Sequence, residues 1–178
     1  IVKDLADDTR HLGRETAKSF GVRSRFVHFE FFRLLSDHEG LGKKGDLMAL
    51  EVNMRPSGGF TPDMINFARE TDVYKIWADM VAYDSTQKPV GTHHFCAFAG
   101  LRDGKDFALT PDDIIEKYDD HLKMVERMPD ALADAMGNQM YLATFDTDEE
   151  LHTFFADVTR QKEPDVSVTS EAAEMVES

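Results

Sequence analysis

Two runs of alternating apolar and polar residues in the first third of the chain predict a pair of β-strands, Phe26–Arg33 and Leu47–Asn53. Successive side chains of a strand point to opposite faces, so residues two apart share a face. If the runs pair antiparallel with their apolar rows toward one core, Glu30, Glu51 and Asn53 all emerge on the opposite face. The pattern therefore predicts a polar patch on a two-stranded hairpin.

Helical periodicity and helix-start signals predict the elements around this hairpin. The predicted helices are Val2–Phe20, one with Thr61 as its N-cap, one capped by Asp72, one opening at Thr110, a short helix or turn at Pro129–Met136, and a last one opening at the capping box Thr147–Glu150. The further predicted strands are Thr92–Leu101, a short one at Phe107–Leu109, His121–Met128 and Met140–Phe145. Leu5, Leu12 and Phe20 are expected on the buried stripe of the first helix, and Trp77 in the core. The order favours an α+β fold, a mostly antiparallel sheet with helices on one face.

The length of 178 residues and the 42% hydrophobic content are those of a globular domain with a core of its own. We expect this domain to span residues 1–160. Residues 161–178 are acidic and poor in large apolar side chains, which predicts a flexible tail. The first residue is Ile1 rather than Met, so the sequence is interpreted as a fragment, a processed product or a trimmed chain.

Charge and cysteine content narrow the function classes. The formal net charge of −14 argues against a general affinity for nucleic acid or anionic membranes, because both require basic patches. No apolar run approaches the roughly 20 residues of a membrane-spanning helix. Cys96 is the single cysteine, which excludes an internal disulfide and fits a reducing cytoplasm, and we expect it to be a small core residue.

The polar patch carries the chemistry that the sequence suggests. Two carboxylates and an amide oxygen, from Glu30, Glu51 and Asn53, suit a hard divalent cation such as Mg²⁺. The chain continues as 55–59 (Arg-Pro-Ser-Gly-Gly), a cation followed by a flexible turn, which suits phosphate oxygens beside a metal. The structural alternative is that each glutamate forms an ion pair, with Arg33 or Arg55 as the partner.

The segments 27–32 (Val-His-Phe-Glu-Phe-Phe) and 50–59 (Leu-Glu-Val-Asn-Met-Arg-Pro-Ser-Gly-Gly) resemble the metal-binding end of an ATP-grasp ligase. The resemblance covers residues 2–83 well and the remainder loosely. It points to the carboxylate–amine ligases and their carbamoyl phosphate synthase and biotin carboxylase relatives. The fold it implies is the C-terminal lobe of an ATP-grasp enzyme, with a C-terminal extension.

The resemblance also implies residue roles. Glu30, Glu51 and Asn53 would bind the Mg²⁺ or Mn²⁺ ions that bridge ATP phosphates, and Arg55 would contact the phosphorylated intermediate. The backbone N–H groups of Ser57, Gly58 and Gly59 would hold the same oxygens or the acceptor carboxylate. The implied reaction is an ADP-forming ligation, in which a small-molecule carboxylate is activated as an acyl phosphate and joined to an amine. A homodimer is an open alternative to a monomer.

The family's active site also needs a lobe that supplies the nucleotide lid and an N-terminal domain that forms much of the substrate pocket. Neither is found before Ile1 in this sequence. We therefore expect the isolated chain to bind Mg·ATP weakly and to catalyse little, with the missing lobes supplied in cis or by a separate chain. The alternative from another class is a non-catalytic ATP-grasp remnant, or a split-gene subunit, that acts as a binding or assembly module.

Overall fold

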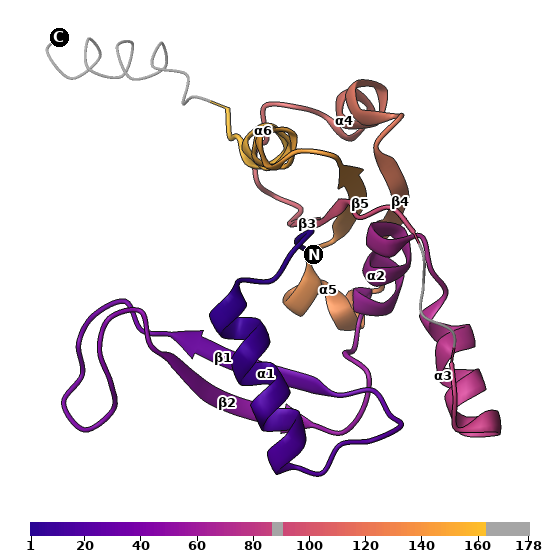
Figure 1. Ribbon diagram of the computed structural model, residues 1–178. Helices are drawn as coiled ribbons and strands as arrows, with labels where there is room; N and C mark the ends of the chain where they lie inside the picture. The colour runs from indigo at the N-terminus through magenta and orange to yellow at the C-terminus, as the bar shows by residue number, and fades with distance from the viewer. Residues whose placement is uncertain (87–90, 163–178) are drawn as a thin grey trace, which may run out of the picture. The chain divides into compact units, whose positions relative to one another are not determined.

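The computed structural model describes residues 1–86 and 91–162, and within them the chain forms six helices and five strands (Figure 1). The helices are α1 Asp7–Ser19, α2 Thr61–Arg69, α3 Val73–Tyr83, α4 Pro111–Tyr118, α5 Asp130–Met136 and α6 Asp148–Thr159. The strands are β1 His28–Arg33, β2 Leu47–Asn53, β3 Phe95–Leu101, β4 Leu122–Arg127 and β5 Gln139–Phe145. The α+β class is confirmed. Of the predicted tail, only residues 161 and 162 belong to the described part.

The strands form two sheets instead of the single sheet expected. One sheet is the antiparallel pair β1–β2, and the other has the order β3-β5-β4, in which β4 and β5 are antiparallel. The reason lies in the connection after β2, which enters two consecutive helices before β3 begins. The predicted short strand at Phe107–Leu109 is reduced to an isolated bridge between Phe107 and Gln161.

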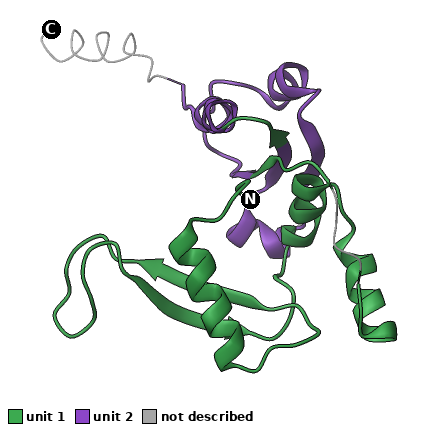
Figure 2. Cartoon of the chain, in the orientation of Figure 1, with its two compact units in different colours: residues 1–97, 144–147 green, residues 98–143, 148–178 purple. Residues whose placement is uncertain are grey.

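The chain divides into two compact units (Figure 2). Unit 1 comprises Ile1–Ala97 and Thr144–Thr147, and unit 2 comprises Phe98–Ala143 and Asp148–Ser178. Unit 2 has a dense core in which side chains of α4, β5 and α6 are almost fully buried. The side chains concerned are Ile114 (1% exposed) and Tyr141, Leu142, Phe154 and Val158 (each 0%). In unit 1, Ala68 (0%) and Cys96 (2%) are buried, and the expected core position of Cys96 is confirmed.

Two helix starts agree with the sequence-based predictions, whereas the N-cap expected for α2 and the buried stripe expected on the first helix do not. Asp72 caps α3 as predicted, by accepting a hydrogen bond from the Lys75 N–H (3.0 Å). The helix α4 begins at the predicted position, where Thr110 forms a capping box. Thr61 was expected as the N-cap of α2 but is its first helical residue, and the N-cap Phe60 makes no side-chain cap bond. The buried stripe expected on the first helix is also wrong: α1 has no buried residue, and Leu5 lies before it and is 53% exposed.

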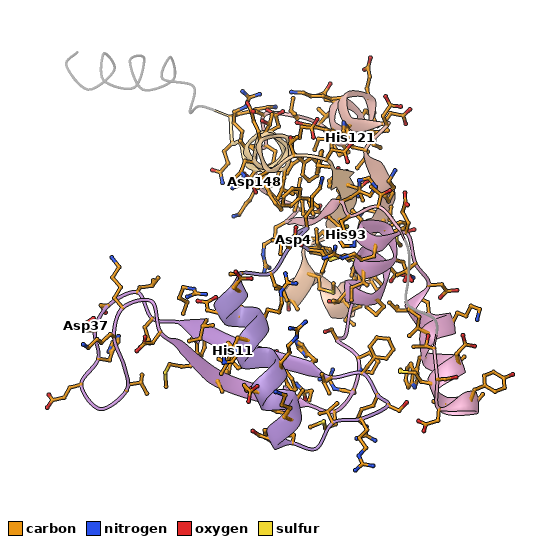
Figure 3. The ribbon with its side chains drawn as sticks, viewed as in Figure 1. Asp4, His11, Asp37, His93, His121 and Asp148 are labelled. Carbon is orange, nitrogen blue, oxygen red and sulfur yellow. The ribbon has the colours of Figure 1, made fainter. Side chains whose placement is uncertain are left out.

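Within unit 1, the β1–β2 hairpin is anchored by a contact with α1 and by hydrogen bonds inside the loop that joins its strands. The Asp8 carboxylate at the start of α1 accepts hydrogen bonds from the Arg33 guanidinium of β1 (2.8 and 3.1 Å). The hairpin loop is ordered by its own contacts: Asp37, labelled in Figure 3, accepts a hydrogen bond from the Lys44 N–H (2.8 Å). Arg33 is therefore committed to Asp8, not to Glu30 or Glu51.

Candidate functional site

The β1–β2 register decides which side chains share a face. Glu30 lies directly opposite Glu51, and His28 directly opposite Asn53, in the antiparallel pair. Opposite residues of an antiparallel pair project to the same face, and residues two apart along a strand do as well. The prediction that Glu30, Glu51 and Asn53 share one face is confirmed, and His28 joins them. We call these four residues the hairpin carboxylate site.

A β-bulge lies next to this site. The register shifts between Glu30 and Phe31, so that Phe31 pairs with Ala49 and Leu50 has no partner opposite it. Leu50 was expected in the apolar row facing the core, but its side chain is 55% exposed. The physical reason is the extra residue, which breaks the strict alternation on which the prediction depended.

The two glutamates have no cationic partner of the kind that a structural role would require. Glu51 is exposed and makes no ion pair or side-chain hydrogen bond within residues 1–86 and 91–162. Glu30, with a side chain 41% exposed, has only the His28 ring, whose Nε2 lies 3.5 Å from Glu30 Oε1. Like charges directly opposite one another on a sheet are destabilising. Because neither carboxylate has a lysine or arginine partner, this repulsion is not compensated within the described chain.

Two buried polar atoms of the site also lack partners. His28 Nδ1 and one end of the Asn53 amide, Nδ2, are buried without a hydrogen bond. A half-turn of the amide exchanges Nδ2 with Oδ1 and would place an oxygen at that buried position. Buried polar groups are normally satisfied, so each of these two atoms requires a partner, either an ordered water or a ligand.

The donor set fits a magnesium or manganese ion. Carboxylate and amide oxygens are hard ligands, and an ion near Glu30 and Glu51 would relieve their repulsion while Asn53 supplies a third oxygen. No group of three or more His, Cys, Asp or Glu side chains in the described ranges is arranged to hold a metal. His28, Glu30 and Glu51 are therefore not arranged as a three-residue metal centre, and the candidate donor set is the two carboxylates with the Asn53 amide oxygen.

Arg55 and the turn that follows β2 lie next to this set. The Arg55 guanidinium is exposed, and its Nη1 donates to the Pro56 carbonyl oxygen (3.0 Å). It makes no ion pair with any carboxylate of the described chain, so the structural alternative of an Arg55–glutamate pair is wrong here. Two residues span at most about 7 Å, which keeps the backbone of Arg55 near Asn53.

The turn 57–59 offers backbone donors. Gly59 adopts a left-handed conformation (φ 59°), which a residue with a Cβ rarely takes. Among the residues described, no acceptor is recorded for the N–H groups of Ser57, Gly58 or Gly59. Successive free N–H groups in such a turn suit an anion. Arg55, Ser57 and Gly58 line one cavity, whereas Glu30, Glu51 and Asn53 share a face of the hairpin and are not part of that lining.

Sequence reasoning missed the surroundings of Arg55. Trp77 was assigned to the core, but it is 49% exposed, and Tyr74 one turn earlier is 54% exposed. The signal was present in α3, where apolar residues occupy two adjacent stripes: Val73, Ile76 and Met80 form one, and Tyr74, Trp77 and Val81 the other. A helix of this kind can bury only one of the two stripes against its own unit.

His93 and His94 are adjacent residues of the predicted strand Thr92–Leu101, where alternation lets at most one of them face a given site, and in the structure both precede β3. His94 Nδ1 lies 2.7 Å from Asp146 Oδ1, and its Nε2 lies 3.6 Å from Glu70 Oε1, all within unit 1. His93, labelled in Figure 3, is exposed. Neither histidine is one of the four residues of the hairpin carboxylate site.

No family model matches the sequence, and no curated protein sequence matches it significantly. Within the described part of the chain, no helix combines the length and the apolar character needed to cross a bilayer. Any functional conclusion therefore depends on the geometry of the hairpin and on the resemblance of its two motifs.

Proposed function

We propose that the chain supplies the metal-binding lobe of an ATP-dependent, ADP-forming ligase of the ATP-grasp type, which joins a carboxylate to an amine. The observation that carries this proposal is the direct opposition of Glu30 and Glu51 across β1–β2, with Asn53 at the strand end and no lysine or arginine of the described chain paired with either carboxylate. The resemblance of residues 27–32 and 50–59 to the family's motifs supports the same conclusion.

In this proposal each residue has a definite task. Glu30, Glu51 and Asn53 hold Mg²⁺ or Mn²⁺, which neutralises phosphate charge and orients the β- and γ-phosphates of ATP. Arg55 binds the transferred phosphoryl group or the carboxylate that receives it. The free N–H groups of the turn 57–59 orient the same oxygens. The protein contributes positioning and charge compensation rather than covalent chemistry.

The proposed reaction has two steps. A carboxylate oxygen of the substrate attacks the γ-phosphorus, the bond to the bridging oxygen breaks, and ADP leaves with those electrons. The amine then attacks the acyl carbon and expels inorganic phosphate, while the amine proton passes to phosphate or solvent. A complete active site needs a nucleotide-binding lobe in addition, and we place that lobe in the same protein or in a partner chain.

The test is metal binding, followed by turnover. Mn²⁺ is titrated into the protein in the presence of ATP and followed by electron paramagnetic resonance, for the natural sequence and for Glu30→Gln, Glu51→Gln and the double variant. We expect each single change to weaken Mn²⁺ binding at least about tenfold, because each removes one of two charged ligands. Glu39→Gln, at an exposed position of the hairpin loop, is the matched control and should bind as the natural chain does.

The outcomes separate the candidate functions. Unchanged Mn²⁺ binding in the double variant would contradict the metal assignment. In the complete protein, ADP release that depends on an added carboxylate and amine and is abolished by the double change supports the ligase. Metal and nucleotide binding without any ADP release, under a broad screen of carboxylates and amines, would favour the non-catalytic module instead.

A further inference from the structure

A cavity of about 400 Å³ lies in unit 1 beside Arg55. Its walls come from the segment leading into β1 (Phe26 and Val27), from residues 55–58 of the turn, and from the facing sides of α2 and α3. Cavities of roughly 300–1,000 Å³ are typical of small-molecule sites in proteins. The volume is therefore sufficient for a small organic ligand.

The walls of the cavity are mainly apolar, and its aromatic side chains remain accessible. Trp77 is 49% exposed and Tyr74 is 54% exposed, although both line a concave surface. The Tyr74 hydroxyl donates to Asp63 Oδ1 (3.2 Å), which holds the ring at the cavity wall. Aromatic rings gain most when an apolar group covers them, so the cavity favours a ligand with an aromatic or branched aliphatic body.

One charged side chain belongs to the lining, and it is a cation. Arg55 is exposed and has no carboxylate partner in the part of the chain that the structure describes. An arginine fork binds a carboxylate through two parallel hydrogen bonds. A guanidinium without a carboxylate partner in the wall of an apolar cavity therefore favours a ligand that is apolar at one end and anionic at the other.

We propose that this cavity is the specificity pocket for the carboxylate substrate, and that the substrate is an apolar carboxylic acid or amino acid. Its aromatic or branched side chain lies against Trp77 and Ile65, and its carboxylate lies at Arg55. That the ligand is a substrate rests on the proposed function; that the cavity binds apolar carboxylates does not. Because Arg55 follows Asn53 by two residues, the bound carboxylate lies at the metal-binding end of the hairpin, where it would receive the phosphoryl group.

The chain contains its own reporter for this proposal. Trp77 is the single tryptophan of the sequence and lines the cavity, so tryptophan fluorescence reports on this side chain alone. The probes are 3-phenylpropionate, which has both features, 3-phenylpropylamine, which has the ring and the opposite charge, and glutarate, which has carboxylates without an apolar body. We expect a saturable change in Trp77 emission with 3-phenylpropionate, at an affinity at least about tenfold higher than for either comparator.

Two variants test the two halves of the pocket. Arg55→Gln, at an exposed position where folding is not at risk, should weaken 3-phenylpropionate binding about tenfold or more. Arg23→Gln removes the same charge from an exposed residue outside the cavity and should leave binding unchanged. Ile65→Phe fills part of the cavity and should also weaken binding, while circular dichroism confirms an unchanged helix content.

Three results would overturn the proposal. The first is an equal response to the three probes, and the second is unchanged affinity in Arg55→Gln. The third is a Trp77 emission that shifts with protein concentration, together with dimers in sedimentation, because a second copy would then cover the cavity.

The proposed function can fail separately. Glu30→Gln/Glu51→Gln should bind 3-phenylpropionate as the natural chain does while losing Mn²⁺. If the natural chain binds 3-phenylpropionate but no Mn²⁺, the metal-dependent function is refuted and the pocket stands. The reverse result refutes the pocket alone.

Discussion

The opposition of Glu30 and Glu51 predicts that removing one charge changes the stability of the protein in opposite directions without and with magnesium. The perturbation is Glu51→Gln, which keeps the size and shape of the side chain and deletes its charge. In the metal-free protein the substitution removes a like-charge repulsion across the strands. In the presence of Mg²⁺ it removes a ligand.

The magnitude follows from the register. Residues directly opposite in an antiparallel pair have Cβ atoms about 5 Å apart, and two unit charges at that distance in water repel by roughly 0.8 kcal/mol. Both carboxylates are accessible to solvent, so the value for water applies. We therefore expect Glu51→Gln to raise the free energy of unfolding by about 0.5–1 kcal/mol at low ionic strength, and by less when salt screens the charges.

Magnesium should reverse the order. A ligand that binds only the folded protein stabilises it by about 1.4 kcal/mol when its concentration is tenfold above the dissociation constant. The natural chain should gain this amount, and Glu51→Gln should gain little because one of its two charged ligands is gone. The two stability curves then cross as Mg²⁺ is added.

The assay is urea denaturation followed by circular dichroism, at low salt, with and without Mg²⁺, for the natural chain, Glu51→Gln and the control Glu39→Gln. The reasoning is refuted if Glu51→Gln is less stable than the natural chain without metal, since the two charges would then not repel. It is equally refuted if Mg²⁺ stabilises the natural chain and Glu51→Gln to the same extent.

Three further predictions concern the rest of the fold. Tyr141→Phe should leave the free energy of unfolding unchanged or raise it by up to about 1 kcal/mol, because the Tyr141 hydroxyl is buried without a partner. Tyr118→Phe should lower the free energy of unfolding by about 1.5–3 kcal/mol, because the Tyr118 hydroxyl donates to an aspartate of α6. Equal effects of the two substitutions in urea denaturation would contradict this prediction. The Arg33 guanidinium lowers the pKa of Asp8 from 3.8 to about 2, so the pair's contribution is complete above about pH 4 and is lost as the pH falls toward 2; in acid titrations Asp8→Asn should flatten that part of the stability curve, and an unchanged curve would count against the pair. Gly100→Ala should cost about 1–3 kcal/mol in thermal unfolding, because its Cβ would collide with a backbone carbonyl of α5, and an unaltered melting temperature would show that the two segments do not approach.

Local sequence signals were sufficient to predict most of the helices and strands. Alternation predicted β1 and β2, and the strand bounds Leu47–Asn53 are those observed. Capping chemistry at Asp72 and Thr110 predicted the starts of α3 and α4, because a side chain within three residues supplies the hydrogen bond. The shared face of Glu30, Glu51 and Asn53 also followed from the sequence, on the condition that the two strands pair antiparallel with their apolar rows toward one core.

Tertiary structure decided what lies around that face. The bulge that exposes Leu50, the commitment of Arg33 to Asp8 and the division of the strands into two sheets all depend on partners distant in sequence. The sequence of α3 has two apolar stripes, and periodicity does not indicate which of them packs against the rest of unit 1. Trp77 was therefore predicted in the core, although it lines an open cavity. The sequence by itself determined that Glu30, Glu51 and Asn53 share a face of the hairpin, whereas only the packing of α2 and α3 beside Arg55 decided that an apolar cavity lies there.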